Sequence, residues 1–367
     1  MYKKNFSSTF AMPMLYRFLL LFVWSYGMLP SLHAQVDFYF TPPNGWSMDR
    51  HHRTVADVDG DGKADIIGFG EKGVFVSFSD GQNFSIPQLL VNNFSIAVGG
   101  WQVNEHVRTV ADVNGDGKAD IVGFGGGKVL VALSQGRTFG APSVWLEHDL
   151  STRNGWNNRE HVRTATDVNG DGMADLVGFG GAGVFVAFSN GRSFSKPEML
   201  IKNFAIGAGG WEVAKHTRLV ADIDNDQRAD IVAFGGNVFT ARSTGTRFAE
   251  PSRLDQMSFF INPNWWNLKR HRRMMADVNG DGSADIVGFT EYKVYVALAV
   301  GGSFDTQRMC FEEFNYAQGW SPAKYPIAMG DVNGDGKEDI IGFKDDRVYV
   351  ALSDGRCFGS ARAVSFR

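Results

Sequence analysis

The chain has 367 residues, 21% of them charged and 44% hydrophobic, and this composition excludes a disordered protein. Its formal charge of −4 argues against a nucleic-acid-binding surface, for which a basic stripe would be expected, so no nucleic-acid partner is expected. The 44 glycines and 30 phenylalanines are typical of an all-β repeat protein, in which glycines form turns and aromatic residues fill short strands.

The N-terminal segment 1–34 differs from the rest of the chain. Lys3, Lys4 and Arg17 precede the apolar run 18–24, and the segment ends at the small residue Ala34. This pattern predicts a signal peptide over residues 1–34, and hence a secreted, extracellular protein. The apolar run is short for a transmembrane helix, so an uncleaved membrane anchor is the less favoured alternative. No later segment is apolar enough to span a membrane, so the mature chain is expected not to insert.

Residues 35–367 contain six copies of one loop rich in Asp, Asn and Gly. The copies begin at Asp57, Asp112, Asp167, Asp222, Asp277 and Asp331. They recur with a nearly constant period of about 55 residues, and such a period indicates an array of one supersecondary unit.

Each repeat is expected to contain four short strands. In the second repeat we predict them over 106–111, 119–124, 128–134 and 143–146, with a hairpin turn at 135–136. Four antiparallel strands in about 55 residues are typical of a propeller blade. No stretch carries a sustained helical period, which excludes helical solenoids.

The length of the chain fixes the number of blades. The segment from Gln35 to Arg367 has room for six repeats of about 55 residues and no more. We therefore predict a single all-β domain over 35–367, a six-bladed β-propeller. The segment 36–40 is expected to pair with the C-terminal segment and close the ring, which removes exposed sheet edges. Seven blades is the alternative, for which no sequence is left.

The loop offers oxygen atoms at positions 1, 3, 5 and 9, and glycine at position 6 permits a sharp turn. Closely spaced carboxylates suit Ca²⁺, which takes six to eight oxygen ligands. In the fourth copy Gln227 replaces the glycine, and we expect its Cβ to disfavour the turn, so this loop is not among the candidates. The candidate metal ligands are Asp57, Asp59, Asp61, Asp65, Asp112, Asn114, Asp116, Asp120, Asp167, Asn169, Asp171, Asp175, Asp277, Asn279, Asp281, Asp285, Asp331, Asn333, Asp335 and Asp339. The alternative is that these side chains cap turns and that nearby arginines neutralise them without metal.

A second repeated pattern precedes each loop. A tryptophan lies at a fixed distance before the first aspartate, and in five repeats a histidine and an arginine follow it at fixed spacing. These candidate ligand-binding residues are Trp46, His51, Arg53, Trp101, His106, Arg108, Trp156, His161, Arg163, Trp211, His216, Arg218, Trp266, His271 and Arg273. The sixth repeat keeps Trp320 but has Tyr325 and Ile327 in the other two positions. His106 and Arg108, two positions apart in a strand, are expected to point the same way. The alternative is that the tryptophans are packing residues and that His and Arg tie loops together.

These two patterns carry a family resemblance over residues 36–367. The run Asp-Val-Asn-Gly-Asp-Gly-x-Ala-Asp-Ile-Val-Gly-Phe-Gly resembles the FG-GAP/VCBS repeats of integrin-type propellers, in which such loops hold calcium. With Gly-Gly-Trp-x-Val-x-x-His-x-Arg before it, the chain resembles the Psathyrella velutina lectin-type tandem-repeat lectins. That resemblance implies monosaccharide binding, for example of N-acetylglucosamine or fucose, in shallow pockets between blades.

Two kinds of function fit these patterns. Repeated Trp, His and Arg positions suit a multivalent carbohydrate-binding protein for glycans or glycoconjugates, because identical sites offer avidity. The alternative is a calcium-stabilised adhesion or scaffold propeller that binds a cell-surface protein. An enzyme is not expected, because no acid outside the repeat pattern has a partner at a fixed spacing. The acids considered were Glu147, Glu160, Glu212, Glu312 and Glu313.

The chain has two cysteines, Cys310 and Cys357, both near the last repeat. They could form one disulfide in an oxidising compartment. Spacing along the chain does not fix their distance, so two free thiols remain the alternative.

Overall fold

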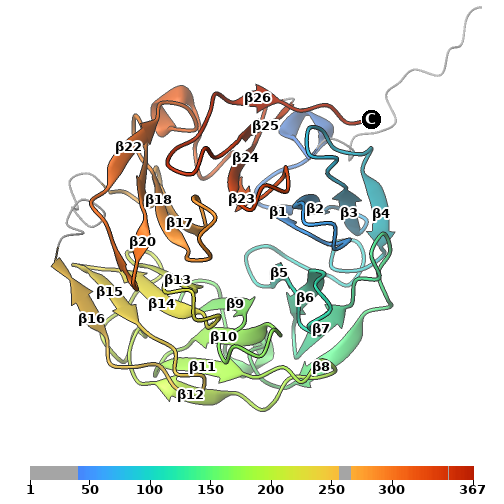
Figure 1. Ribbon diagram of the computed structural model, residues 1–367. Helices are drawn as coiled ribbons and strands as arrows, with labels where there is room; N and C mark the ends of the chain where they lie inside the picture. The colour runs from blue at the N-terminus through green and yellow to red at the C-terminus, as the bar shows by residue number, and fades with distance from the viewer. Residues whose placement is uncertain (1–39, 256–265, 346) are drawn as a thin grey trace, which may run out of the picture. The chain divides into compact units, whose positions relative to one another are not determined.

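The computed structural model describes residues 40–255, 266–345 and 347–367. The chain divides into residues 1–36 and 37–367, and the predicted signal peptide lies outside the described residues. The described residues form six four-stranded antiparallel sheets arranged in a ring, which confirms the six-bladed propeller (Figure 1). None of the described helices is long and apolar enough to cross a membrane.

Each blade takes its four strands in sequence order from one repeat. Blade 1 consists of β1 (His52–Ala56), β2 (Asp65–Phe69), β3 (Val74–Ser77) and β4 (Gln88–Val91). Blade 2 consists of β5 (Val107–Ala111), β6 (Asp120–Phe124), β7 (Lys128–Ala132) and β8 (Ser143–Glu147). Blade 3 consists of β9 (Val162–Thr166), β10 (Asp175–Phe179), β11 (Val184–Ala187) and β12 (Glu198–Ile201). Blade 4 consists of β13 (Thr217–Ala221), β14 (Asp230–Phe234), β15 (Val238–Ala241) and β16 (Ser252–Leu254). The strands of blades 5 and 6 are β17 (Arg272–Ala276), β18 (Asp285–Phe289), β19 (Val294–Ala297) and β22 (Arg308–Phe311); and β23 (Ile327–Gly330), β24 (Asp339–Lys344), β25 (Arg347–Ala351) and β26 (Arg362–Ala363). A short hairpin of β20 (Ala299–Val300) and β21 (Ser303–Phe304) belongs to blade 5, and the described 3-10 turns are η1 (Pro42–Asn44), η2 (Thr152–Asn154) and η4 (Tyr316–Gln318).

The hydrophobic core lies between neighbouring blades. The second strand is the most buried, and every residue of β2 is buried from Asp65 to Phe69. Phe69 and Ile67 of blade 1 pack in one cluster with Ile121 of blade 2, and the same arrangement recurs around the ring. The innermost strands surround the ring axis in Figure 1, and β1 and β9 alternate half-buried and buried residues. Faces of neighbouring sheets therefore pack against each other, and the repeat is stable only as an array.

The aspartate loops, the six segments that run from the first to the ninth position of the motif, join the blades into a closed cycle. The N–H of Ala119 donates to the carbonyl of Asp57 in the preceding blade at 2.8 Å. The N–H of Ala64 donates to the carbonyl of Asp331 at 2.6 Å, which closes the cycle between blades 6 and 1. The other four bonds of the cycle run from Ala174 to Asp112, from Ala229 to Asp167, from Ala284 to Asp222 and from Glu338 to Asp277. The repeated loop is thus an inter-blade connection as well as a turn.

The chain ends add to the closure of the ring. Of the predicted closing strand 36–40, only Phe40 lies among the described residues, and its ring packs against Phe343 and Phe366. The C-terminal segment bonds to blade 1: the N–H of Phe84 donates to Ser365 at 3.0 Å, and Arg367 donates back to Phe84 at 2.9 Å. The outer strand of blade 6, β26, comes from the C-terminal segment itself.

Cys310 and Cys357 form a disulfide, which resolves the alternatives left open by the sequence. Cys310 lies in β22, the outer strand of blade 5, and Cys357 follows β25 in blade 6. The bond therefore crosslinks two neighbouring blades.

Candidate functional site

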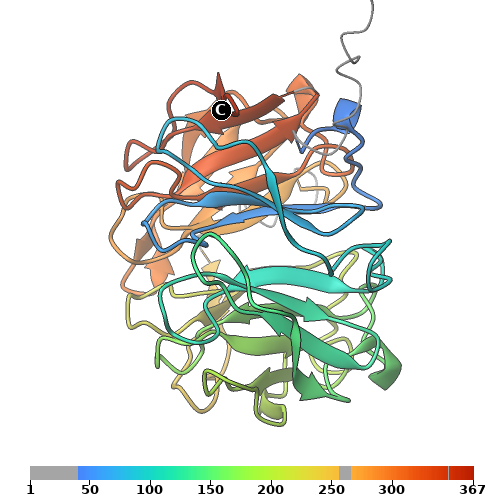
Figure 2. The ribbon, with the colours of Figure 1, turned by 90° about the vertical axis from the view of Figure 1, so that its right-hand side faces the viewer.

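The strand order places the two repeated patterns on opposite faces of the ring. In each blade the turn between the first two strands, which is the aspartate loop, lies on the same side as the turn between the last two. The turn between the second and third strands lies on the other side, with the segment that connects one blade to the next (Figure 2). We call these the loop face and the connector face. The Trp and His positions belong to the connector face.

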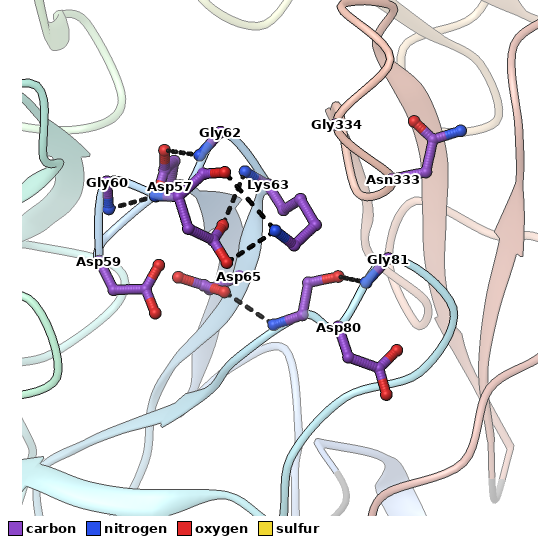
Figure 3. Close-up of polar contacts among 12 residues, drawn as sticks. Asp57, Asp59, Gly60, Gly62, Lys63, Asp65, Asp80, Gly81, Asn333 and Gly334 are labelled. Atoms are coloured by element: carbon purple, nitrogen blue, oxygen red, sulfur yellow. Dashed lines mark hydrogen bonds and ion pairs between the residues drawn. The ribbon is translucent and has the colours of Figure 1, made fainter.

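In the aspartate loops the first aspartate organises the turn. Oδ1 of Asp57 accepts a hydrogen bond from the N–H of Gly60 at 2.7 Å, and Oδ2 accepts one from Gly62 at 2.8 Å (Figure 3). Both glycines have positive φ, 78° and 83°, a conformation that glycine adopts without strain. The turn-capping role considered for these acids is therefore present.

Two of the loops also bring three carboxylates together. Among the described residues, Asp57, Asp59 and Asp61 form one such cluster, with ligand atoms within 4.8 Å of one another. Within the described part of the chain, Oδ1 of Asp59 is buried without a hydrogen-bond partner, while its Oδ2 lies 3.3 Å from Nε of Arg137. Burial and the neighbouring Asp61 raise the pKa of Asp59. Hard oxygen donors, repulsion between them and an unsatisfied oxygen fit a bound cation such as Ca²⁺.

The second cluster is Asp222, Asp224 and Asp226 in the fourth loop, which the sequence had led us to leave out. Gln227 does adopt the turn conformation, with φ 67°, and its N–H donates to Oδ2 of Asp222 at 2.7 Å. Leaving this loop out because the Cβ of Gln227 disfavours the turn was therefore wrong, since the hydrogen bond to Asp222 forms as it does in the glycine loops. Oδ1 of Asp224 is also buried, without a hydrogen-bond partner among the described residues.

In two of the loops with asparagine at the third position, the side chain of that asparagine forms a hydrogen bond with the aspartate at the fifth position. The side-chain amide of Asn169 donates to Oδ2 of Asp171 at 2.9 Å, and that of Asn279 donates to Asp281 at 2.8 Å. In these two loops the amide occupies one oxygen of the fifth-position carboxylate, whereas in the first and fourth loops Lys63 and Arg228 form an ion pair with that carboxylate.

The aspartate at the ninth position lies beneath the loop. Asp65 is fully buried, and its two oxygens accept the N–H groups of Val58 at 3.1 Å and Ser79 at 2.8 Å. Burial raises the pKa of Asp65 to about 8 and that of Asp120, Asp175, Asp230, Asp285 and Asp339 to about 7. The ninth-position aspartates, which were predicted as metal ligands in every loop except the fourth, are thus not members of the two carboxylate clusters and instead tie the loop to the segment after the third strand.

On the connector face the tryptophans are mainly packing residues. Five of them, Trp46, Trp101, Trp211, Trp266 and Trp320, are at most 8% exposed. A Cβ on Gly123 would lie 2.5 Å from Cη2 of Trp101, so the indole packs directly on the second strand of its own blade. Trp156 is half-buried. Of these six indoles, Trp156 and Trp211 line pockets.

The repeated arginines join neighbouring blades. Nη1 of Arg108 donates to the carbonyl of Phe94 at 3.0 Å, and its guanidinium lies 5.5 Å from the ring of Phe69 in the preceding blade. Arg53, Arg163 and Arg218 repeat this arrangement with Phe40, Leu150 and Phe204, and Arg273 stacks on Phe234 at 5.1 Å. All five arginines are at most 8% exposed. The structure places them as inter-blade contacts.

The repeated histidines have a different environment from the arginines. Nδ1 of His216 accepts the N–H of Glu212 at 2.9 Å, and the other four form the equivalent bond. Because Nδ1 accepts, the neutral ring carries its proton on Nε2, which can act as a donor. Burial lowers the pKa of His106, His161, His216 and His271, so the neutral form is favoured. In blades 3 and 4 the histidine and the arginine of one repeat line different cavities: His161 and His216 line one pocket each, and Arg163 and Arg218 line a third.

Two of the histidines line pockets on the connector face. The pocket of blade 4, about 280 Å³, contains Asn203, Trp211, His216, Gly236 and Phe239. The pocket of blade 3, about 460 Å³, contains Trp156, His161, Gly181, Phe185 and Lys196. Each lies between the incoming connector and the turn after the second strand. Sequence reasoning missed these turn residues and Phe204, although each occupies a fixed position in the repeat.

The fold, the repeats and the two loop systems define a repeat-built β-propeller, and comparison with known proteins identifies its family. The FG-GAP-like repeat model matches residues 57–123, 167–233 and 277–342, and the chain belongs to this family. No curated protein matches the chain.

Solved structures include a lectin of the same architecture. An Agrocybe aegerita lectin, described as specifically recognising non-reducing terminal N-acetylglucosamine, is 38% identical, with a TM-score of 0.71. The match covers 88% of this chain and 82% of that one. A part of the Photorhabdus luminescens Tc holotoxin is 17% identical with a TM-score of 0.57, covering 86% of this chain but 14% of that chain, and shows likeness in fold alone.

Proposed function

We propose that this protein is a multivalent carbohydrate-binding propeller whose sugar sites are the pockets of the connector face. The observation that carries the proposal is the 38% identity, over 88% of the chain, to a lectin that recognises terminal N-acetylglucosamine. The proposed ligands are glycans or glycoconjugates that end in a sugar of this kind.

The chemistry of the pockets suits one sugar ring. Their walls are largely apolar, with Trp211 and Phe239 in blade 4, and the histidine supplies a donor of fixed direction. Apolar walls with a few oriented polar groups are the usual composition of small-ligand sites. Each pocket is small, so a single site is expected to bind weakly, and repetition on one face adds avidity for a glycan-coated surface.

Substitution of the pocket histidines tests this function. In His161→Ala/His216→Ala, binding to immobilised N-acetylglucosamine is expected to fall at least tenfold, whereas Arg192→Ala on the loop face serves as the matched control. A glycan array without any bound sugar, with and without Ca²⁺, would refute the proposal. Capture of a cell-surface protein that resists free sugars would favour the scaffold function instead.

We further propose that the first and fourth loops bind Ca²⁺. The supporting observation is that both hold three converging carboxylates and, among the described residues, a buried carboxylate oxygen without a partner. Asp57, Asp59 and Asp61 would hold one ion, and Asp222, Asp224 and Asp226 the other. The role proposed for the ion is to neutralise these carboxylates and stabilise the loop face.

Export from the cell is also proposed. The charged and apolar pattern of residues 1–34 supports a signal peptide, and a disulfide between Cys310 and Cys357 fits an oxidising compartment. N-terminal sequencing of secreted protein tests this, with a mature start near Gln35 expected and an intact Met1 as the contradicting result.

A further inference from the structure

One position of the repeat divides the six connector-face sites into two kinds. It lies in the turn between the second and third strands, at the same distance along the chain from the first aspartate in every repeat. The residues there are Glu71, Gly126, Gly181, Gly236, Glu291 and Asp345. In blades 3 and 4 this position lines the pocket beside His161 and His216.

Where the position is acidic, the carboxylate contacts the side chain that lines the pocket elsewhere. Oε2 of Glu291 lies 3.4 Å from Nε2 of His271, and Oε2 of Glu71 lies 3.6 Å from Nε2 of His51. In blade 6 the hydroxyl of Tyr325, which replaces the histidine, donates to Oδ1 of Asp345 at 2.6 Å. Two His–Glu pairs and one Tyr–Asp pair therefore bring a carboxylate oxygen to the same place in the repeat.

The residue before the histidine changes together with this position. Arg50 forms an ion pair with Glu71 at 2.5 Å, and Arg270 does the same with Glu291. In the glycine repeats the corresponding residues are Glu105, Glu160 and Lys215. In blades 1 and 5 the arginine before the histidine thus holds the glutamate in place through an ion pair. The three glycine repeats have no arginine at that position.

Exposure of the histidines follows the same division. His51 is 4% exposed and His271 6%, whereas His106, His161 and His216 are half-buried. The glycines leave open space, because a Cβ on Gly126, Gly181 or Gly236 would meet no heavy atom of the described residues within 4 Å. Their φ angles are not positive, so glycine is not required there by the backbone.

The two kinds of site occupy two halves of the ring. Blades 2, 3 and 4 carry glycine and are adjacent, and blades 5, 6 and 1 carry the acid and are adjacent as well (Figure 1). We propose that sugar binding is confined to the arc of blades 2–4, and that the acid of blades 5, 6 and 1 closes the corresponding pockets by binding His51, His271 and Tyr325. This inference rests on the proposed carbohydrate-binding function. It implies that a glycan-coated surface is engaged along one side of the connector face.

Native mass spectrometry with free N-acetylglucosamine counts the bound sugars per chain and tests this proposal. We expect saturation at three sugars for the wild type, five for Glu71→Gly/Glu291→Gly and one for Gly181→Glu/Gly236→Glu. Glu71→Ala/Glu291→Ala, which opens the site without adding a glycine, should also give five. The matched control is Glu198→Ala on β12, an exposed acid outside the pockets, with three expected.

The outcomes separate this inference from the proposed function. Five or six sugars on the wild type, or an unchanged count in both sets of variants with wild-type melting temperatures, overturns the half-ring arrangement and leaves the lectin function intact. The absence of bound sugar in the wild type and in every variant overturns the lectin function itself.

Discussion

Nη1 of Arg108 donates to the carbonyl oxygen of Phe94 at 3.0 Å, and Phe94 has a positive φ of 58°. A positive φ is unusual for a bulky residue and costs free energy that the surroundings must offset. The same conformation occurs at Phe40, Leu150, Phe204 and Phe314. Arg108 therefore supplies the hydrogen bond to a buried carbonyl in a strained part of the connector. The same guanidinium lies over the ring of Phe69 in the preceding blade.

Arg108→Ala is expected to lower the free energy of unfolding by about 2 kcal/mol, because it leaves the buried carbonyl of Phe94 without a donor. Chemical denaturation measures this, with the exposed Arg159→Ala as the matched control. Sugar binding in blades 3 and 4 should persist in the folded variant. Wild-type stability together with lost sugar binding would instead make Arg108 a ligand residue.

Calcium is expected to raise the melting temperature in a concentration-dependent way, because an ion that binds only the folded state stabilises it by about 2.7 kcal/mol at one hundred times its dissociation constant. The double variant Asp59→Asn/Asp224→Asn should lose this response. Asp171→Asn, in a loop with asparagine at its third position, should retain it. A melting temperature that is indifferent to Ca²⁺ and to chelator would contradict the metal sites.

Sugar binding is expected to be constant from pH 7 to 8 and to weaken as the pH falls below the ordinary histidine pKa of about 6.5. Burial places the folded-state pKa of His161 and His216 below the ordinary value of about 6.5. The folded state then binds fewer protons than the unfolded state between these two pKa values. The neutral rings therefore contribute to folding stability above pH 6.5, and this contribution is lost as the pH falls through the folded-state pKa. Protonation of Nδ1 would also break its bond to the connector N–H.

The melting temperature is a poorer readout for this effect, because the buried aspartates act in the opposite direction. The pKa values of these aspartates are raised to about 7, so the folded state keeps protons that the unfolded state loses above about pH 4. The contribution of the aspartates to folding stability therefore falls as the pH rises. Binding isotherms at several pH values isolate the histidines. A sugar affinity that is independent of pH down to the pH at which the protein unfolds would contradict the role of the histidines.

Replacement of both cysteines by serine is expected to destabilise the protein by about 4 kcal/mol, from the loop-closure entropy of a bridge that spans 47 residues. Thermal unfolding of Cys310→Ser/Cys357→Ser measures the loss, with dithiothreitol-treated wild type as the comparison. Sugar binding should survive, because blades 5 and 6 lie outside the proposed binding arc. A variant with wild-type stability would show that the bridge does not stabilise the ring.

The repeat period was enough to predict the architecture, since a six-fold spacing of Asp57 and its equivalents leaves little choice of fold. The strands of the second repeat were predicted closely, for example 106–111 against Val107–Ala111. The side chains of the candidate sites were harder to place. Trp101 and Arg108 share the spacing of a binding motif, but burial between blades depends on neighbours that lie far away in sequence.

The other differences between the predicted and the observed sites also arise from contacts that form only in the folded chain. Whether Gln227 tolerates a positive φ depends on the hydrogen bond to Asp222 and not on residue type alone. The glycine and acid pattern at Gly181 and Glu291 is visible in the aligned repeats, yet its meaning depends on the contact of Glu291 with His271, which only the folded blade provides.

The central claim is that sugars bind in the connector-face pockets. A crystal structure of the protein soaked with N-acetylglucosamine tests it most directly. The expected result is a sugar within hydrogen-bonding distance of Nε2 of His161 and of His216, between the connector and the turn that contains Gly181 or Gly236. An ordered sugar elsewhere on the ring, with both of these pockets empty at saturating concentration, would contradict the claim.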